Sequence, residues 1–133
     1  MAVRSNTRPA RSTVQRAQAK RLELEPRIKL WVEKDGHLVL SDYRVRILQL
    51  VQETGSLAQA AERLGLSYRR VWGKVREIEQ NVGLSLVESE VGGAGGGGSS
   101  LTTDGERLVK LYERFRRRME GELGKEFRQL FKE

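Results

Sequence analysis

Apolar side chains in the middle of the chain recur with the period of an α-helix. One series has offsets of 0, 3, 4 and 7 and consists of Leu57, Ala60, Ala61 and Leu64. A second series has steps of 4, 3 and 4 and consists of Val71, Val75, Ile78 and Val82. Ser56 and Ser67 precede the two series as N-caps, and Gly65 stands where a helix end favours positive φ. The pattern predicts two helices that meet at a short turn.

The opposite face of the second predicted helix is basic. At about 100° per residue, that face carries Arg69, Arg70, Gly73, Arg76 and Gln80, with Lys74 on one flank. No acidic residue occurs from 66 to 76. The small pair Ala60 and Ala61 lets the helices cross closely, so the second projects its basic N-terminal turns. This geometry is typical of a helix-turn-helix that enters a DNA major groove. The alternative is an ordinary helical hairpin with a solvated charged face.

The segment before these helices predicts a β-hairpin and a third helix. Residues 27–40 alternate around Asp35-Gly36, with Ile28, Leu30, Val32, Leu38 and Leu40 inward. A helix capped by Ser41 or Asp42 is expected to end near Thr54-Gly55. Its apolar residues are Val45, Leu48 and either Val51 or Gln52, with Ile47 and Leu50 beside them. This helix completes a three-helix core. Two interpretations remain open for Arg44 and Arg46, phosphate contact or plain surface charge.

A glycine run follows the basic helix. Residues 84–91 alternate and predict a strand, with Leu84, Leu86 and Val91 inward, and residues 92–98 are glycine apart from Ala94. Gly93, Gly95 and Gly98 match the spacing of a dinucleotide fingerprint, but no βαβ unit surrounds them and no P-loop lysine is present. Too little chain follows for a linker to a further domain. The preferred interpretation is the tip of a β-hairpin wing, whose backbone N–H groups approach phosphates.

The last segment predicts one long helix. Thr103 and Glu106 form a capping box, although the helix could also begin at Thr102. From Thr103 to Phe131 the helix would span roughly 40 to 45 Å. Gly121 and Gly124 each cost about 1 kcal/mol in a helix interior and favour a bend. One small domain cannot cover so long an apolar stripe, so a partner helix is expected to cover it. The predicted dimerisation residues are Leu108, Leu111, Tyr112, Phe115, Met119, Leu123 and Phe127, with Leu130 and Phe131 extending the stripe.

Composition narrows the class of partner. The 133 residues carry a formal net charge of +7 with a sequence pI near 10.1, which favours polyanions, nucleic acid before anionic membrane. The chain has no cysteine, so disulfides and thiolate metal sites are excluded. No apolar run is long enough to span a membrane. His37, the single histidine, lies beside the predicted Asp35-Gly36 turn without a catalytic or metal partner. No metal cluster, catalytic triad or paired carboxylate is apparent, so we expect no enzyme and no cofactor.

Basic charge is concentrated at three places. The chain up to Arg21 has six basic residues and no acid, residues 107–118 have six basic residues against Glu113, and the third place is the basic helix. The N-terminal stretch is poor in large apolar residues and is expected to be a disordered arm, either tracking DNA or merely solubilising. The predicted division is an arm at 1–26, a DNA-binding domain at 27–102 and a dimerisation helix at 103–133.

The order of helix-turn-helix, glycine-tipped hairpin and long closing helix resembles a LysR-type winged helix domain. Local residues are similar to the N-terminal DNA-binding domain of the molybdate-responsive ModE regulators. The matching stretches are Gly55-Ser56-Leu57, Ala60-Ala61, Leu66-Ser67-Tyr68-Arg69-Arg70-Val71-Trp72, Leu86-Val87-Glu88, the glycines of 92–98, Leu101-Thr102 and Gly105. The resemblance implies a prokaryotic, cytoplasmic and nucleoid-associated regulator that dimerises through its first and last helices. Molybdate binding is not carried over, because the oxyanion-binding domains of ModE are absent from this sequence.

The fold class expected is therefore an α-rich α+β winged helix-turn-helix with an N-terminal β-hairpin and a long dimerisation helix. The predicted function is transcription regulation by a homodimer on double-stranded operator DNA. The alternative is an architectural DNA-binding protein with little sequence preference. A third class is an interaction module whose long helix pairs with a different chain. Tyr68 and Trp72 are expected to pack more than to touch bases. The predicted DNA-binding residues are Ser67, Tyr68, Arg69, Arg70, Gly73, Lys74, Arg76, Gly95, Gly96, Gly97, Gly98 and Ser99.

Overall fold

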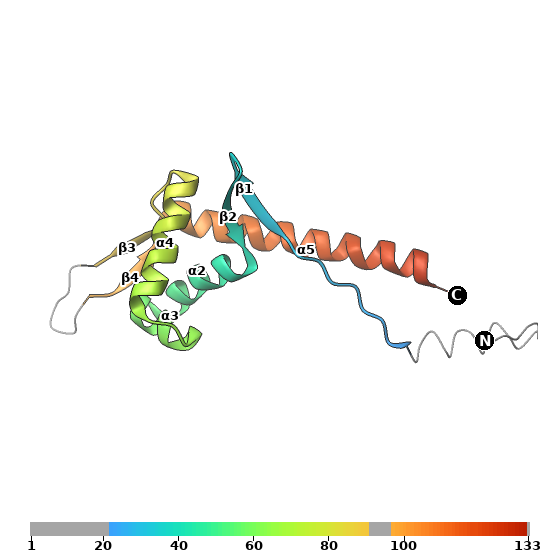
Figure 1. The fold of residues 1–133 in the computed structure, drawn as a ribbon, viewed down its shortest axis with the longest axis horizontal. Helices are drawn as coiled ribbons and strands as arrows, with labels where there is room; N and C mark the ends of the chain where they lie inside the picture. The colour runs from blue at the N-terminus through green and yellow to red at the C-terminus, as the bar shows by residue number, and fades with distance from the viewer. Residues whose placement is uncertain (1–21, 91–96, 133) are drawn as a thin grey trace, which may run out of the picture. The chain divides into compact units, whose positions relative to one another are not determined.

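The computed structural model describes residues 22–90 and 97–132 (Figure 1). Residues 30–116 form one compact unit, and the other described residues, 22–29 and 117–132, fall in a second. Most of the predicted arm, Val91 and the glycines up to Gly96 lie outside the described residues. The elements in chain order are β1 (Trp31–Lys34), β2 (His37–Ser41), α2 (Asp42–Thr54), α3 (Leu57–Leu64), α4 (Tyr68–Val82), β3 (Val87–Ser89), β4 (Ser99–Leu101) and α5 (Thr103–Phe131).

The first hairpin is confirmed. β1 and β2 are antiparallel, and both turn residues have positive φ, 52° at Asp35 and 80° at Gly36. Two such residues in succession are what the favoured two-residue hairpin turn requires. The register shifts between Val32 and Glu33, so simple alternation fails on the second strand. Val39 and Leu40 are both buried there, whereas Leu38 is half-buried.

The three predicted helices α2, α3 and α4 are confirmed with their caps. Ser41, Ser56 and Ser67 each accept a hydrogen bond from the backbone N–H three residues on. The C-terminal ends are closed by left-handed glycines at Gly55, Gly65 and Gly83. Local sequence therefore determines where each helix begins and ends, as expected when caps satisfy the orphan backbone groups.

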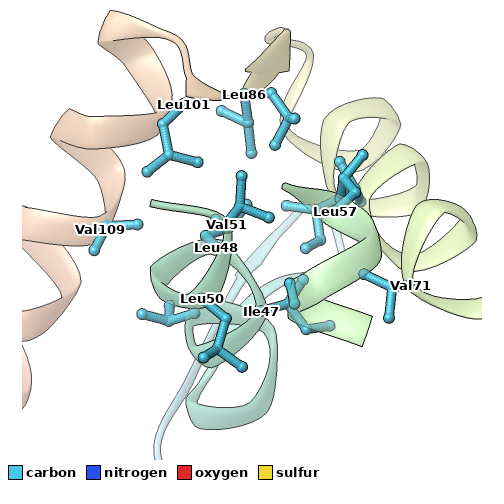
Figure 2. Close-up of a cluster of buried hydrophobic side chains, with 14 of the residues drawn as sticks. Ile47, Leu48, Leu50, Val51, Leu57, Val71, Leu86, Leu101 and Val109 are labelled. Carbon is cyan, nitrogen blue, oxygen red and sulfur yellow. The ribbon is translucent and has the colours of Figure 1, made fainter. Parts of the chain in front are cut away.

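One apolar core joins the helices to the second hairpin and to α5. Burying each Leu, Ile or Val side chain contributes about 1.5–3 kcal/mol, so this core supplies most of the drive to fold. The predicted apolar faces of α2, α3 and α4 all enter the core, although Leu64 and Val82 are partly buried and Gln52 is exposed. The core side chains labelled in Figure 2 are Ile47, Leu48, Leu50, Val51, Leu57, Val71, Leu86, Leu101 and Val109.

Arg44 of α2 has neither of the two roles expected of it, phosphate contact or plain surface charge. Arg44 is only 5% exposed. Its guanidinium donates to the Leu38 carbonyl at 3.2 Å and to the Glu77 carboxylate of α4 at 2.9 Å. The prediction of phosphate contact or plain surface charge is therefore wrong, because a tertiary contact with α4 takes up the charge. Arg46 remains on the surface, paired with Glu53 at 3.1 Å.

The second hairpin is shorter than expected. β3 pairs antiparallel with β4 over three residues, from Val87 opposite Leu101 to Ser89 opposite Ser99. Leu86 is buried as predicted, but Leu84 is 40% exposed, so its inward assignment is wrong. The reason is tertiary, because the backbone N–H groups of Leu86 and Val87 donate to the Glu79 carboxylate of α4. The segment before β3 is therefore held both by that carboxylate and by the Thr102 N–H, which donates to the Leu86 carbonyl at 2.8 Å.

α5 runs from Thr103 to Phe131 and remains helical at Gly121 and Gly124. Its cap is one residue earlier than the capping box predicted. Thr102 Oγ1 accepts from the Gly105 N–H at 2.9 Å and donates to the Ser85 carbonyl at 2.7 Å. The second contact explains the shift, since it fixes Thr102 against the segment before β3.

Tyr112 joins α5 to α2 and to the residue before β1. Its hydroxyl lies 2.5 Å from Asp42 Oδ1 and 3.1 Å from the Leu30 carbonyl oxygen, and Arg116 reaches the other Asp42 oxygen at 3.3 Å. Burial, with the Asp42 carboxylate beside it, raises the pKa of Tyr112 to about 12. The ring therefore serves the fold as a neutral hydrogen-bond donor.

Candidate nucleic-acid interface

α4 is packed against the compact unit on one side and exposed on the other. Val71, Val75 and Ile78 are fully buried on one side, and α3 packs against α4 (Figure 1). Because these three residues lie on one face of a 3.6-residue helix, the opposite face must point to solvent. The side chains of Arg69 and Arg70 are on that exposed face, as the apolar pattern predicted.

Tethers at the C-terminal end of α4 hold its direction. Lys34 Nζ of β1 donates to the Val82 carbonyl at 3.2 Å, and Asn81 Nδ2 donates to the Leu38 carbonyl at 2.7 Å. The Glu79 carboxylate accepts two backbone N–H groups at the start of the second hairpin. A helix fixed in this way presents its N-terminal turns at a defined angle. None of these tethers has a signal in the local sequence, because their partners lie 7 to 48 residues apart in the chain.

The N-terminal turns of α4 carry cations without partners. Arg69 and Arg70 are exposed, and neither side chain forms a hydrogen bond or ion pair within residues 22–90 and 97–132. The first turn holds no acidic residue, so the positive end of the helix dipole adds to their field. Five other arginines of the described chain are in ion pairs: Arg27, Arg44, Arg46, Arg63 and Arg116.

Three more residues of α4 that were predicted to bind DNA follow Arg69 and Arg70 in the sequence. Arg76 is exposed, and its guanidinium carbon lies 5.5 Å from the centre of the Trp72 ring, a cation–π contact that orients it. Gly73 is exposed, with nothing within 4 Å of where a Cβ would stand. Lys74 is half-buried. Arg44, and to a smaller extent Lys74, lowers the pKa of the Glu77 carboxyl on the next turn.

The expectation that Tyr68 packs inward is wrong. Tyr68 is 52% exposed and stands at the first position of α4, beside Arg69. Trp72 does pack against the core, as predicted. Ser67 accepts the Arg70 backbone N–H at 3.1 Å, so its hydroxyl oxygen is already used as the cap.

The base of the second hairpin is joined to the turn between α2 and α3. The Ser99 N–H donates to the Gly55 carbonyl at 2.8 Å, and Ser99 is buried. A Cβ at Gly98 would lie 3.1 Å from the same carbonyl oxygen, so this position favours glycine. Gly97 is exposed, whereas Gly95 and Gly96 lie outside the described residues. From the sequence, Gly55 is recognisable only as the end of a helix. Nothing near it in the chain indicates that its carbonyl accepts a hydrogen bond from Ser99 of β4.

The predicted dimerisation stripe divides between the fold and the surface. In the compact unit Leu108 is partly buried against the core and Tyr112 is buried, whereas Leu111 and Phe115 are 46% and 43% exposed. Val109 and Gly105 are buried and were not expected to be. In residues 117–132, taken by themselves, Met119, Leu123 and Phe127 are half-buried, and Leu130 and Phe131 are exposed.

Two other kinds of site are absent from the described residues. Within 22–90 and 97–132, no group of three or more His, Cys, Asp or Glu side chains is placed to hold a metal ion. No helix in the same part of the chain has the length and apolarity needed to cross a bilayer.

Known proteins show the same combination of features. Residues 43–106 match the bacterial regulatory helix-turn-helix protein family of the LysR type. The transcriptional regulator ModE of Yersinia pestis is 36% identical over 90 residues, which are 68% of this chain and 34% of that protein. The DNA-binding transcriptional dual regulator ModE of Escherichia coli K12 is 34% identical over 90 residues, with the same coverage. The chain thus spans about a third of the length of these relatives.

Solved structures share the fold. The DNA-binding domain of CbnR, crystallised in complex with DNA, has a TM-score of 0.52 at 23% identity and covers 68% of this chain and 98% of its own. The BenM DNA-binding domain, in a complex with benA site 1 DNA, has a TM-score of 0.52 at 16% identity, covering 71% and 100%. The segment at residues 43–106 is thus similar to the LysR-type bacterial regulatory helix-turn-helix family, and 90 residues of the chain are similar to ModE transcriptional regulators.

Proposed function

We propose that this protein regulates transcription by binding double-stranded operator DNA as a homodimer, with α4 as the recognition helix. The observation that carries the proposal is the pair Arg69 and Arg70, exposed and unpaired within the described residues on the N-terminal turn of a helix whose other face is fully buried. The ModE relatives are named as transcriptional regulators, and the CbnR and BenM domains were crystallised with DNA. We extend that role to this chain.

The two arginines are assigned to bases and their neighbours to the backbone. A guanidinium can donate two parallel hydrogen bonds to guanine O6 and N7 in the major groove, and its rigid planar fork is already shaped for this, whereas the lysine ammonium is a point charge on a flexible stem. Arg76, exposed on the same face, and Lys74, half-buried on its flank, would neutralise flanking phosphates, and Ser67 and Gly73 would let the backbone approach closely. Tyr68, exposed beside Arg69, adds an apolar surface that suits a thymine methyl group.

The second hairpin is assigned to the sugar-phosphate backbone beside the major groove. Its glycines, Gly95 to Gly98, would bring backbone N–H groups against a phosphate strand or into the minor groove. The Ser99 N–H is bonded to Gly55 and the residue is buried, so Ser99 acts by orienting the wing. The basic arm before residue 27 would add salt-sensitive affinity.

Each segment of the chain has its own role in the proposed homodimer. Residues 1–26 form the arm, 27–102 the DNA-binding domain and 103–133 the helix through which two copies associate. Two copies related by a two-fold axis would read a palindromic operator, with half-sites spaced by whole helical turns. The protein acts in the cytoplasm on the nucleoid. Molybdate is left out of the proposal, because the similarity covers about a third of the ModE chains.

The test is selection of bound duplexes from a random DNA pool with the full chain. We expect one enriched sequence with two-fold symmetry. Arg69→Ala and Arg70→Ala should each weaken binding to that sequence by about 1–3 kcal/mol, because a base is no longer hydrogen-bonded, and relax preference at one position. The double variant Arg27→Ala/Arg63→Ala is the matched control, since both of these exposed arginines are ion-paired outside α4. A pool without enrichment would instead identify an architectural DNA-binding protein.

A further inference from the structure

The side of α5 that faces away from the core carries regularly spaced cations. In the compact unit these are Arg107, Lys110 and Arg114, called here the α5 basic face. At 3.6 residues per turn they lie within an arc of about 60°, and the buried residues Val109 and Tyr112 lie on the other side of the helix. The face is therefore turned to solvent by the same packing that buries the opposite side.

None of these cations is neutralised within the described chain. Arg107, Lys110 and Arg114 are all exposed, and no hydrogen bond or ion pair joins their side chains to residues 22–90 or 97–132. Lys110 and Arg114 are four residues apart, a spacing at which like charges destabilise a helix. The same sequence spacing continues along α5 at Arg118, Lys125 and Arg128, which are also exposed. A polyanionic partner would relieve this repulsion.

We propose that the α5 basic face binds the phosphate backbone of duplex DNA without regard to sequence, as a surface separate from α4. The face suits a phosphate backbone, because arginine donates bidentate hydrogen bonds to phosphate as it does to carboxylate, and the row of cations about one helical turn apart matches a row of like anions. This goes beyond the recognition role of α4, which concerns base edges. It gives the protein a second contact with DNA, either beside the operator or on another segment.

Two other partners fit the observations less well. A protein interface has an apolar core with aromatic anchors, and the α5 basic face offers neither. An interfacial membrane helix uses its apolar side for insertion, but on this stretch of α5 Val109 and Tyr112 are packed inside the fold, and the exposed Leu111 and Phe115 belong to the stripe proposed to pair two copies. A duplex requires nothing from α5 except its exposed cations.

The experiment measures how the affinity of the full chain for duplex DNA falls with salt. Two duplexes of equal length are used, one with the selected sequence and one with that sequence scrambled. Each phosphate neutralised contributes about 0.9 to the slope of log K against log salt. The triple variant Arg107→Gln/Lys110→Gln/Arg114→Gln should therefore lower the slope on both duplexes by about 2 to 3 for each copy whose α5 basic face contacts the duplex. The affinity ratio between the two duplexes should stay unchanged.

The matched control is Arg27→Gln/Lys29→Gln/Arg63→Gln, which removes the same charge from exposed positions outside α4 and α5. A slope that falls equally in both triple variants would overturn the proposal, since net charge alone would then explain it. It would also be overturned if the α5 variant lost binding to phosphatidylglycerol vesicles and kept its slope on DNA. The affinity ratio between the selected and the scrambled duplex tests α4 separately. If the wild-type protein binds both duplexes equally well, the recognition role of α4 fails. The proposal for α5 still stands in that case, provided that the slope falls in the α5 variant.

Discussion

Arginines of this chain take different roles according to what surrounds them. Arg44 is buried and bound to a carbonyl and a carboxylate inside the fold, whereas Arg69 and Arg70 are exposed with no partner in the described residues. Burying a charge is tolerated only with such compensation, so Arg44 is held by structure and is not available to a ligand. An arginine at a helical position is therefore informative about function only once its partners are known.

Gly105 has a role that side-chain chemistry does not reveal. A Cβ at this position would overlap the Leu86 carbonyl oxygen, closer than any real Cβ approaches another atom. The first turn of α5 therefore approaches the segment before β3 at backbone distance. The required absence of a side chain fixes the start of the second hairpin against α5, since Leu86 directly precedes β3.

Gly105→Ala is expected to destabilise the protein by about 1–3 kcal/mol, because the added methyl group forces backbone atoms apart. Gly121→Ala is the matched control on the same helix, with nothing within 4 Å of its Cβ position. It should stabilise by about 0.5–1 kcal/mol through helix propensity. Urea unfolding of the two variants measures both effects, and equal stability of Gly105→Ala and wild type would contradict the expected clash.

At the scale of elements, the position of α4 is fixed by contacts between its side chains and neighbouring elements. Glu77 pairs with Arg44 of α2, Glu79 holds the segment before β3, and Asn81 holds β2 through Leu38. The acidic side chains that α4 does carry therefore lie toward its C-terminal half and bind the fold. Its N-terminal half is left positive, which is the arrangement that a DNA-reading helix needs.

The Arg44–Glu77 pair predicts a pH-dependent contribution to stability. Arg44, by hydrogen bond and charge, lowers the pKa of the Glu77 carboxyl below its ordinary value of 4.5. Because the folded pKa is below the unfolded one, the contribution is complete above the unfolded pKa and is lost as pH falls through the folded pKa. Glu77→Gln should thus be less stable than wild type at pH 7, by at most about 1 kcal/mol because Glu77 is half-exposed.

The stability difference between Glu77→Gln and wild type should shrink as pH is lowered below 4.5, where the native carboxyl gains a proton. Denaturant unfolding at a series of pH values measures it. Glu62→Gln, an exposed substitution on α3 outside any ion pair of the described residues, is the matched control. Parallel pH profiles for Glu77→Gln and wild type would contradict the pH-dependent contribution of the pair.

At the scale of the whole molecule, the exposed apolar side chains of α5 are the feature that the compact unit leaves uncovered. Leu111 and Phe115 are close to half exposed, although their neighbours Val109 and Tyr112 are buried. Large apolar groups grouped on one exposed face are typical of an interface. They support the proposed association of two copies through α5, without taking part in the core that holds the monomer.

Phe115→Glu is expected to weaken that association while leaving the fold intact, because Phe115 is 43% exposed and lies outside the buried core. Removing an aromatic anchor from an interface costs about 2 kcal/mol or more, roughly a thirtyfold rise in the dimer dissociation constant. Sedimentation equilibrium without DNA measures it, with Gln52→Glu on the exposed side of α2 as the control. A wild-type chain that sediments as a monomer would refute the homodimer.

The sequence by itself determined the elements and the exposed basic face of α4. Helix caps, left-handed glycines and the Asp35-Gly36 turn are local signals, and apolar periodicity assigns the buried side of a helix without knowing what covers it. The tertiary structure alone decided the burial of Arg44, the exposure of Leu84 and Tyr68, the choice of Thr102 over Thr103 as the cap of α5 and the close approach at Gly105. Most of these depend on contacts between elements distant in sequence, and those contacts leave no periodic trace in the residues that make them.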